Sequence, residues 1–322
     1  MATLSTLACI TGAKNTGISA CVFDPKNFVG VLLCPPNFVI PAAQLATLQA
    51  YLLAQSENDS KALRIYPIGN FFDFKDSSEA PVVEKFGYGQ SNTVRDGVYD
   101  WAFRFRLGAL NLSNRARSFN GSAWWYLLID SKNQIVGTSA IDNTGAASIG
   151  AIPPIELYAD PFKPNDGKKT SEYWLNLRFL PKYINEEVAY ITDAGFDVLN
   201  TITGLKDIAL TGVGSATPGT YTVTPIAGDD KTNLAALLPV AILQTGAWKA
   251  YNTETGAAVT ITGVTLATSG TAVNIAATTT SPPYPGTGQH ISFDMVGPTE
   301  LAALATPIVG YESAGPVSIA KN

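Results

Sequence analysis

Two segments of the chain alternate strictly between apolar and polar side chains. Across Tyr99–Leu107 the odd-numbered positions carry Tyr, Trp, Phe, Phe and Leu, and the even-numbered positions carry Asp, Ala, Arg and Arg. A similar alternation runs through Tyr173–Phe179. A period of two gives a β-strand one apolar and one polar face, so both segments predict long, half-buried strands. On the polar face of the first, Arg104 and Arg106 are expected to be solvated or paired with a partner.

Shorter apolar runs between turn residues predict many further strands before residue 200. Asp-Pro-Lys-Asn at 24–27 is typical of a turn and predicts a hairpin of Ile18–Phe23 with Phe28–Leu33. The polar, glycine-containing stretch 70–97 is either an extended loop or a long hairpin arm that reaches beyond the core. The other predicted strands are Arg64–Ile68, Val82–Phe86, Trp124–Ile129, Gln134–Thr138, Ile155–Ala159 and Val188–Thr192.

One convincing helix interrupts this pattern, at about 41–55. Pro41 suits a first helical turn, and Leu45, Leu48 and Leu52 recur at helical spacing on one face. We therefore expect a single amphipathic helix that packs across a sheet.

The composition changes near residue 200. Of the 90 residues from 205 to 294, 8 are charged, against 39 of the other 232. Short Thr- and Val-rich runs at roughly ten-residue spacing predict a small sandwich of immunoglobulin type. The fold class is therefore all-β. The domains are a β-sandwich or barrel core with one flanking helix (1–200), an immunoglobulin-like β-sandwich (201–298), and a tail (299–322) whose last strand could return to the first domain.

The charge balance of the chain indicates which classes of partner to expect. Charged residues make up only 15% of the chain and the formal net charge is −5. Low surface charge favours association, so we expect a homo-oligomer of copies of this chain. The sequence contains no basic stripe of the kind that indicates nucleic-acid binding, so we expect no sequence-specific nucleic-acid binding. The positive charges that come closest to such a stripe are Arg95, Arg104, Arg106, Arg115 and Arg117.

Targeting signals are not evident in the sequence. Residues 1–10 lack the basic and apolar regions of a secretory signal, and no run of about 20 apolar residues predicts membrane insertion. We expect a protein made and folded in a cytoplasm.

Reactive side chains are few and poorly spaced for chemistry. His290, Ser292 and Asp294 share one face of a predicted strand, where His290 and Asp294 would lie roughly 13 Å apart, too far for a catalytic triad. The cysteines, Cys9, Cys21 and Cys34, fit neither a disulfide framework nor a zinc motif, so we expect them to stay reduced and without metal.

Carboxylates, glycines and tryptophans also favour structural roles. Gly87-Tyr-Gly89 lacks the context of a phosphate-binding loop, and most of the tryptophans lie at strand positions where packing explains them. The acidic groups at Asp73, Asp76, Glu79 and Glu84 and at Asp229 and Asp230 fit solvated loops better than a hydrolase or a calcium site. We predict no enzyme activity, no catalytic, cofactor-binding or metal residues, and no cofactor.

One region resembles a known family. The run Phe71-Phe-Asp-Phe-Lys-Asp-Ser-Ser-Glu-Ala-Pro leads through Gly87-Tyr-Gly89 to Arg95-Asp-Gly-Val-Tyr-Asp-Trp, and Trp124-Trp-Tyr-Leu-Leu-Ile-Asp follows. It resembles virion structural proteins of tailed bacteriophages, most of all tail tube proteins. The resemblance covers about 1–200 and implies a β-sandwich with a flanking helix and a long loop that stacks into rings. It implies a self-assembling virion protein whose partners are its own copies and other virion proteins.

Other classes remain open. A major capsid protein, including a double jelly-roll, or a capsid-decorating protein would also be β-rich and poor in cysteine. A surface adhesin and a virion-borne glycosidase fit the sequence less well.

Overall fold

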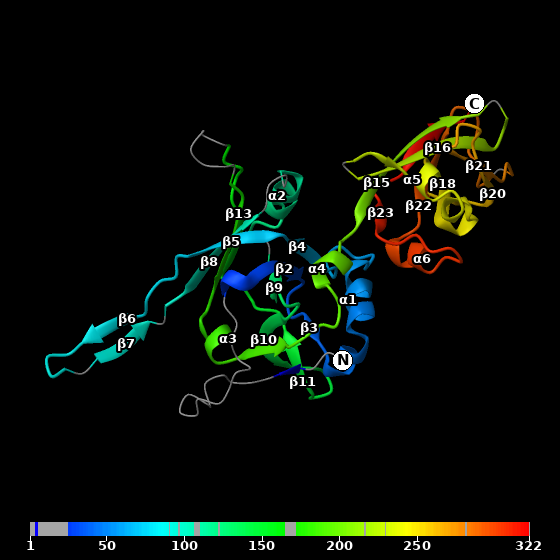
Figure 1. Ribbon diagram of the computed structural model, residues 1–322. Coiled ribbons are helices and arrows are strands. Elements are labelled where there is room, and N and C mark those ends of the chain that lie inside the picture. The colour runs from blue at the N-terminus through cyan, green and yellow to red at the C-terminus, as the bar shows by residue number, and fades with distance from the viewer. Residues whose placement is uncertain are drawn as a thin grey trace. The chain divides into compact units, whose positions relative to one another are not determined.

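The computed structural model describes residues 4–5, 25–89, 91–95, 97–105, 110–121, 123–164, 172–215, 217–228, 230–280 and 282–321 (Figure 1). The chain divides into two compact units. Unit 1 comprises residues 1–56 and 62–203, and unit 2 comprises residues 57–61 and 204–322. Both are built mainly of β-strands, which confirms the all-β fold class.

A large sheet of eight strands forms the centre of unit 1. Its strands follow the order β1-β14-β10-β9-β2-β4, and β11 extends from β10 to β3 at one corner. All of these pairings are antiparallel. The bounds are β1 (Leu4–Ser5), β2 (Phe28–Cys34), β3 (Val39–Ile40), β4 (Tyr66–Gly69), β9 (Trp125–Asp130), β10 (Ile135–Ile141), β11 (Ala147–Gly150) and β14 (Val188–Ile191).

A second, antiparallel sheet contains both alternating segments. Its order is β12-β13-β8-β5, with β5 (Phe71–Asp76), β8 (Tyr99–Phe105), β12 (Glu156–Ala159) and β13 (Trp174–Phe179). The register sets Trp101 opposite Leu177 and Phe103 opposite Leu175, so the apolar faces of the two predicted strands coincide. The two strands therefore present one shared apolar face to the core.

The two sheets of unit 1 enclose one apolar core, and a second core lies on the other side of the large sheet. Val31 and Leu33 belong to the first core, while Leu32 and Cys34 belong to the second. Burial on both faces explains why β2 is a continuous apolar run without alternation. Unit 1 is thus a β-sandwich with an added helical layer.

That layer is α1 (Leu48–Ser56), preceded by a 3₁₀ segment, η2 (Ala42–Thr47). Leu48 and Leu52 are buried in the second core. The helix expected over 41–55 is thus found, but its first part is wound as 3₁₀. The other helices of unit 1 are short: η1 (Pro25–Asn27), α2 (Leu110–Arg117), α3 (Lys182–Asn185) and α4 (Val198–Thr201).

The described residues between 70 and 97 form a long hairpin arm, one of the two expected alternatives. Beyond β5 and β8, the chain continues as β6 (Val82–Lys85) and β7 (Ser91–Arg95), which pair with each other. The backbone N–H of Ser77 donates to Asp100 O, and that of Glu79 to Val98 O, which links the sheet to the arm. Figure 1 shows the arm, in cyan, projecting from the body of unit 1.

Unit 2 is a two-sheet sandwich with immunoglobulin-like strand order. One sheet runs β20-β21-β16-β15-β23, with β17 beside β16, and the other runs β19-β18-β22-β24. In chain order these match the ABED and C′CFG arrangement, including a first strand that pairs in parallel near the end of the domain. The first sheet has β15 (Lys206–Gly214), β16 (Thr220–Ala227), β17 (Thr232–Asn233), β20 (Ile261–Leu266), β21 (Val273–Ala277) and β23 (Tyr311–Ser313). The second has β18 (Trp248–Asn252), β19 (Ala258–Val259), β22 (His290–Met295) and β24 (Val317–Ala320).

Aromatic side chains fill the core of unit 2. Trp248 at the start of β18 is buried, and its indole N–H donates to Ile242 O at 2.9 Å. Tyr221 of β16 and Phe293 of β22 join the two sheets, with ring centroids 4.9 Å apart. The helical segments are α5 (Leu234–Leu237), η3 (Ala241–Leu243), η4 (Thr245–Ala247) and α6 (Pro298–Ala302).

The tail corrects one expectation. Its last strand does not return to the first domain: β24 pairs with β22, and β23 pairs in parallel with β15. The physical reason is that β22 and β15 offer unpaired backbone groups at the edges of their sheets, which the tail satisfies. Residues 311–320 are therefore structural parts of unit 2.

Candidate functional site: an exposed hairpin arm

The outer part of the arm is covered by nothing in the described chain. Every residue of β6 and β7 is exposed. Apolar side chains line it: Val82, Val83, Phe86, Tyr88 and Val94 are 47%, 43%, 46%, 98% and 62% exposed. A two-stranded hairpin without a packing partner is at best marginally stable in water. The arm therefore exposes several apolar side chains close together, a feature typical of interaction surfaces.

The base of the arm is held by charge pairs. The Glu79 carboxylate accepts from Arg178 Nη2 at 2.7 Å and from Arg95 Nη2 at 3.4 Å. Gly97 lies against the backbone of Glu79, where a Cβ would collide with the Glu79 carbonyl oxygen. The Tyr99 hydroxyl donates to Asn185 Oδ1 at 3.0 Å. These contacts join the base of the arm to β13 through Arg178 and to α3 through Asn185.

Of the two alternatives expected for the strand face that carries Arg104, solvation or pairing with a partner, the structure excludes open solvation. The Arg104 side chain is only 14% exposed, and its guanidinium lies 5.0 Å from the Phe72 ring centroid and 5.9 Å from that of Trp174. Carboxylate oxygens of Asp73 and Glu172 each lie 4.0 Å from it. Cross-strand neighbours on the same sheet face thus enclose the cation, so it offers no open basic patch.

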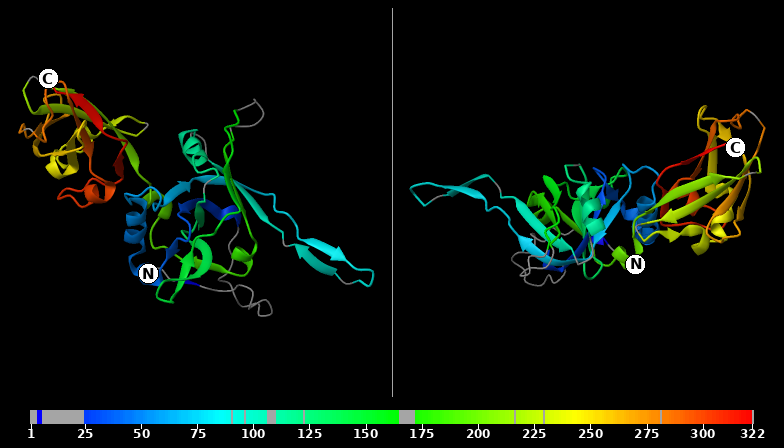
Figure 2. Two further views of the ribbon diagram at one scale, coloured as in Figure 1. Left: turned by 180° about the vertical axis from the view of Figure 1, so that it is seen from behind. Right: turned by 90° about the horizontal axis from the view of Figure 1, so that it is seen from above.

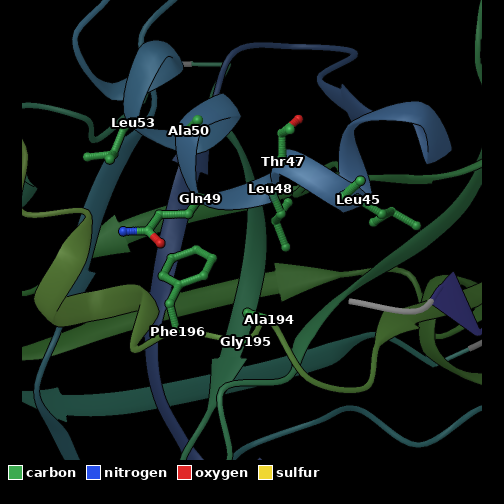
Figure 3. Close-up of a pocket in the computed structure, with 10 residues that line it drawn as sticks. Leu45, Thr47, Leu48, Gln49, Ala50, Leu53, Ala194, Gly195 and Phe196 are labelled. Atoms are coloured by element: carbon green, nitrogen blue, oxygen red, sulfur yellow. The ribbon is translucent and has the colours of Figure 1, made fainter. Parts of the chain in front are cut away.

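A hollow opens on another side of unit 1, between α1 and the segment Ala194–Phe196 (Figure 3). Its volume is about 490 Å³, and its apolar lining includes Leu45, Leu48, Leu53 and Phe196. Residues 41–56, which supply most of its wall, contain no charged side chain. The solvent face of a surface helix normally carries charge. Sequence reasoning missed this hollow, although that uncharged helix was the available signal.

The residues considered for a catalytic triad are not brought together. His290 Nδ1 lies 3.4 Å from Glu254 Oε1, and Ser292 Oγ lies 2.8 Å from Thr253 Oγ1. Asp294 instead accepts from Ser313 and lies 3.6 Å from Lys249 Nζ. Each polar group on β22 has its own neighbour, and no serine–histidine contact forms.

The acidic residues and cysteines take structural positions where they are described. Asp73 pairs with Arg104, Glu79 with Arg178, and Asp230 with Lys206. Cys34 is buried and free, and burial raises the pKa of its thiol well above the usual range. Within the described residues, no group of three His, Cys, Asp or Glu side chains is placed to hold a metal. Cys9, Cys21, Arg106 and Asp229 lie outside the described residues, as does Ile18–Phe23.

The aromatic and glycine candidates are packing and turn residues. Trp101 is in the core of unit 1 and Trp248 in that of unit 2. Trp124 packs against Tyr66 and Phe119, at ring distances of 5.3 and 5.5 Å. Gly87-Tyr-Gly89 forms the end of the arm, with Gly89 at φ +76°. These two glycines therefore belong to the turn at the end of the arm.

Among the described residues, no helix is both long enough and apolar enough to cross a membrane. The chain matches no family model, no curated protein and no solved structure.

Proposed function

We propose that this protein is a structural subunit that assembles with copies of itself, and that it builds a bacteriophage particle as a tail tube protein. The single observation that supports this proposal is the exposed arm of unit 1. It carries five exposed apolar side chains, three on the strands β6 and β7 and two on the turn that joins them, and no described element covers these strands. Burying such a surface in a neighbouring subunit would stabilise both the arm and the assembly.

The remaining architecture is compatible with this role. Unit 1 combines a β-sandwich, the flanking helix α1 and a long hairpin arm, and the tail tube resemblance implies a β-sandwich with a flanking helix and a long loop. Unit 2 has its own core and would decorate the assembly. Other virion proteins would be further partners, and the virion would be the final location.

The first experiment is microscopy of the purified chain. Negative-stain images, together with light scattering at high protein concentration, are expected to show stacked rings or tubes. Closed shells or isolated capsomers would replace the tail tube by the capsid alternative. A monomer at every concentration, with no ordered particle, would contradict the proposal as a whole.

A matched pair of substitutions tests the part played by the arm. Val94 on the arm and Val213 on unit 2 are strand residues of nearly equal exposure, 62% and 64%. Val94→Asp should abolish assembly, because it places a carboxylate within the contact, whereas Val213→Asp should leave assembly unchanged. Equal behaviour of the two variants would exclude the arm as the contact.

A further inference from the structure

The end of the arm has the features of an anchor for a neighbouring subunit. Tyr88 is 98% exposed and Phe86 is 46% exposed; Gly87 lies between them and Gly89 follows Tyr88. Lys85 precedes them and is exposed. Large aromatic side chains near the centre of an interface supply much of its binding energy when they enter a pocket. The arm thus presents an aromatic pair with one adjacent positive charge.

The hollow beside α1 has the complementary chemistry. Its volume of about 490 Å³ falls within the range of natural ligand pockets, and its lining residues carry no charge. Asp193 and Asp197, both exposed, flank the lining segment Ala194–Phe196 in the sequence. The Asp193 carboxylate accepts a hydrogen bond from the N–H of the lining residue Gly195, and that of Asp197 accepts one from Asn200 N. An apolar hollow with adjacent acidic groups suits an aromatic tip preceded by a lysine.

Two other hollows in the described part of unit 1 suit the tip less well. The one at the base of the arm is lined by Glu79, Lys182 and Glu186 together with apolar residues. The other, beside β12, includes Glu156 in its lining. Placing Phe86 and Tyr88 there would desolvate charged groups. The α1 hollow alone among the three has an uncharged lining.

The arm and the α1 hollow lie at opposite ends of unit 1. Figure 1 shows the strands β6 and β7 projecting away from the side on which α1 lies, and both views of Figure 2 agree. The tip therefore cannot reach the hollow of its own unit. Contact between two different surfaces of identical chains is head-to-tail, and repetition of such a contact gives a ring or a filament.

We propose that the tip of the arm, Phe86 to Tyr88, docks into the hollow between α1 and Phe196 of a second copy of this chain, with Lys85 beside Asp193 and Asp197 of that copy. This inference rests on the proposed self-assembly and specifies the contact that produces it. The exposed, uncharged face of α1 would then be buried in the interface.

Thiol crosslinking tests the contact directly. Gly87 has open space around its Cβ position and Gln49 is an exposed residue of the hollow, so both accept cysteine. The full chain carrying Gly87→Cys and Gln49→Cys should give a ladder of multimers with a short thiol crosslinker. An equal mixture of the two single variants should stop at dimers, because each chain then offers one end of the contact.

Controls separate this contact from other ones. Each single variant alone measures the background from the native cysteines, and Gly87→Cys with Lys132→Cys, on an exposed turn, measures random collision. We expect at least roughly tenfold less crosslinking in these controls. Ordered particles without a ladder would overturn the docking inference and leave the proposed function standing. Absence of both particles and ladder would overturn both.

A charge exchange tests the ionic part. Lys85→Glu should weaken assembly roughly three- to tenfold through repulsion by Asp193 and Asp197, and Asp193→Lys should restore assembly in the Lys85→Glu background. Lys132→Glu makes the same charge change elsewhere on unit 1 and should have no effect. Failure of the second charge to restore assembly would contradict the placement of Lys85 beside Asp193.

Discussion

The side-chain amide of Asn120 forms two hydrogen bonds with the backbone of Ala159, the last residue of β12. It donates to the Ala159 carbonyl oxygen at 3.1 Å and accepts from the Ala159 N–H at 2.8 Å. These are the bonds that a neighbouring strand would make. Since β12 is the edge of its sheet, Asn120 closes that edge at its end and blocks strand addition there.

Asn120→Ala should destabilise unit 1 by about 1–3 kcal/mol, because it leaves both Ala159 groups without protein partners. The measurement is the midpoint of urea unfolding. Asn92→Ala, on the exposed strand β7, removes the same side chain and should change the midpoint little. Equal losses in the two variants would show that the amide pairing contributes nothing.

Tyr126 predicts a substitution that stabilises the protein. The side chain is fully buried, and its hydroxyl has no hydrogen-bond partner among the described residues. Tyr126→Phe should therefore raise the free energy of unfolding by about 1 kcal/mol. Tyr284→Phe should have the opposite effect, because that hydroxyl accepts from Gly219 N at 3.1 Å and lies 2.7 Å from the Tyr221 hydroxyl. A loss of stability in Tyr126→Phe would show that the Tyr126 hydroxyl does not destabilise the folded state.

Alkaline pH should destabilise unit 1. Burial raises the pKa of both Tyr126 and Cys34, so each binds its proton more tightly in the folded state. Their contribution to stability is full below the unfolded pKa, about 8.5 for cysteine and about 10 for tyrosine, and is lost as pH rises toward the folded pKa. Urea unfolding between pH 7 and 10.5 should show this decline. In Tyr126→Phe the decline above about pH 10 should be smaller, and an identical slope would contradict the assignment.

Unit 1 should assemble without unit 2. A chain ending at Thr203 retains both cores of unit 1 and the arm, so microscopy should show the same particle with a thinner outer layer. Deleting only 201–298 is a different test, because it leaves β23 and β24 without β15 and β22. That variant should aggregate. Loss of assembly in the chain ending at Thr203 would make unit 2 part of the building contact.

The sequence predicted the strands well because their burial is periodic. Alternation placed Trp101, Phe103, Leu175 and Leu177 on one buried face, and the structure confirms it. The change in composition near residue 200 likewise predicted an immunoglobulin-like sandwich, and the strand order agrees.

Features that depend on distant pairs could not be predicted. Arg104 occupies a polar position in the alternation of β8. Phe72 and Trp174 nevertheless enclose it, because β5 and β13 are the strands on either side of β8. The sequence of the tail predicts a short β-strand but not its partner. The partner is determined by which strands of unit 2 have an unpaired edge. The hollow beside α1 arises from two segments about 145 positions apart, which no local pattern reveals.

The parallel pairing of β23 with β15 has a consequence for synthesis. Lys206–Ile208 of β15 meet Tyr311–Ser313, so about 100 residues must follow this strand before the ribosome has made its partner. Unit 1 has all of its strands by residue 191 and can fold first. A nascent chain therefore carries a finished unit 1 beside an open, Thr- and Val-rich sheet. During that interval the edge of β15 that later pairs with β23 has unpaired backbone groups, which are open to pairing with other chains.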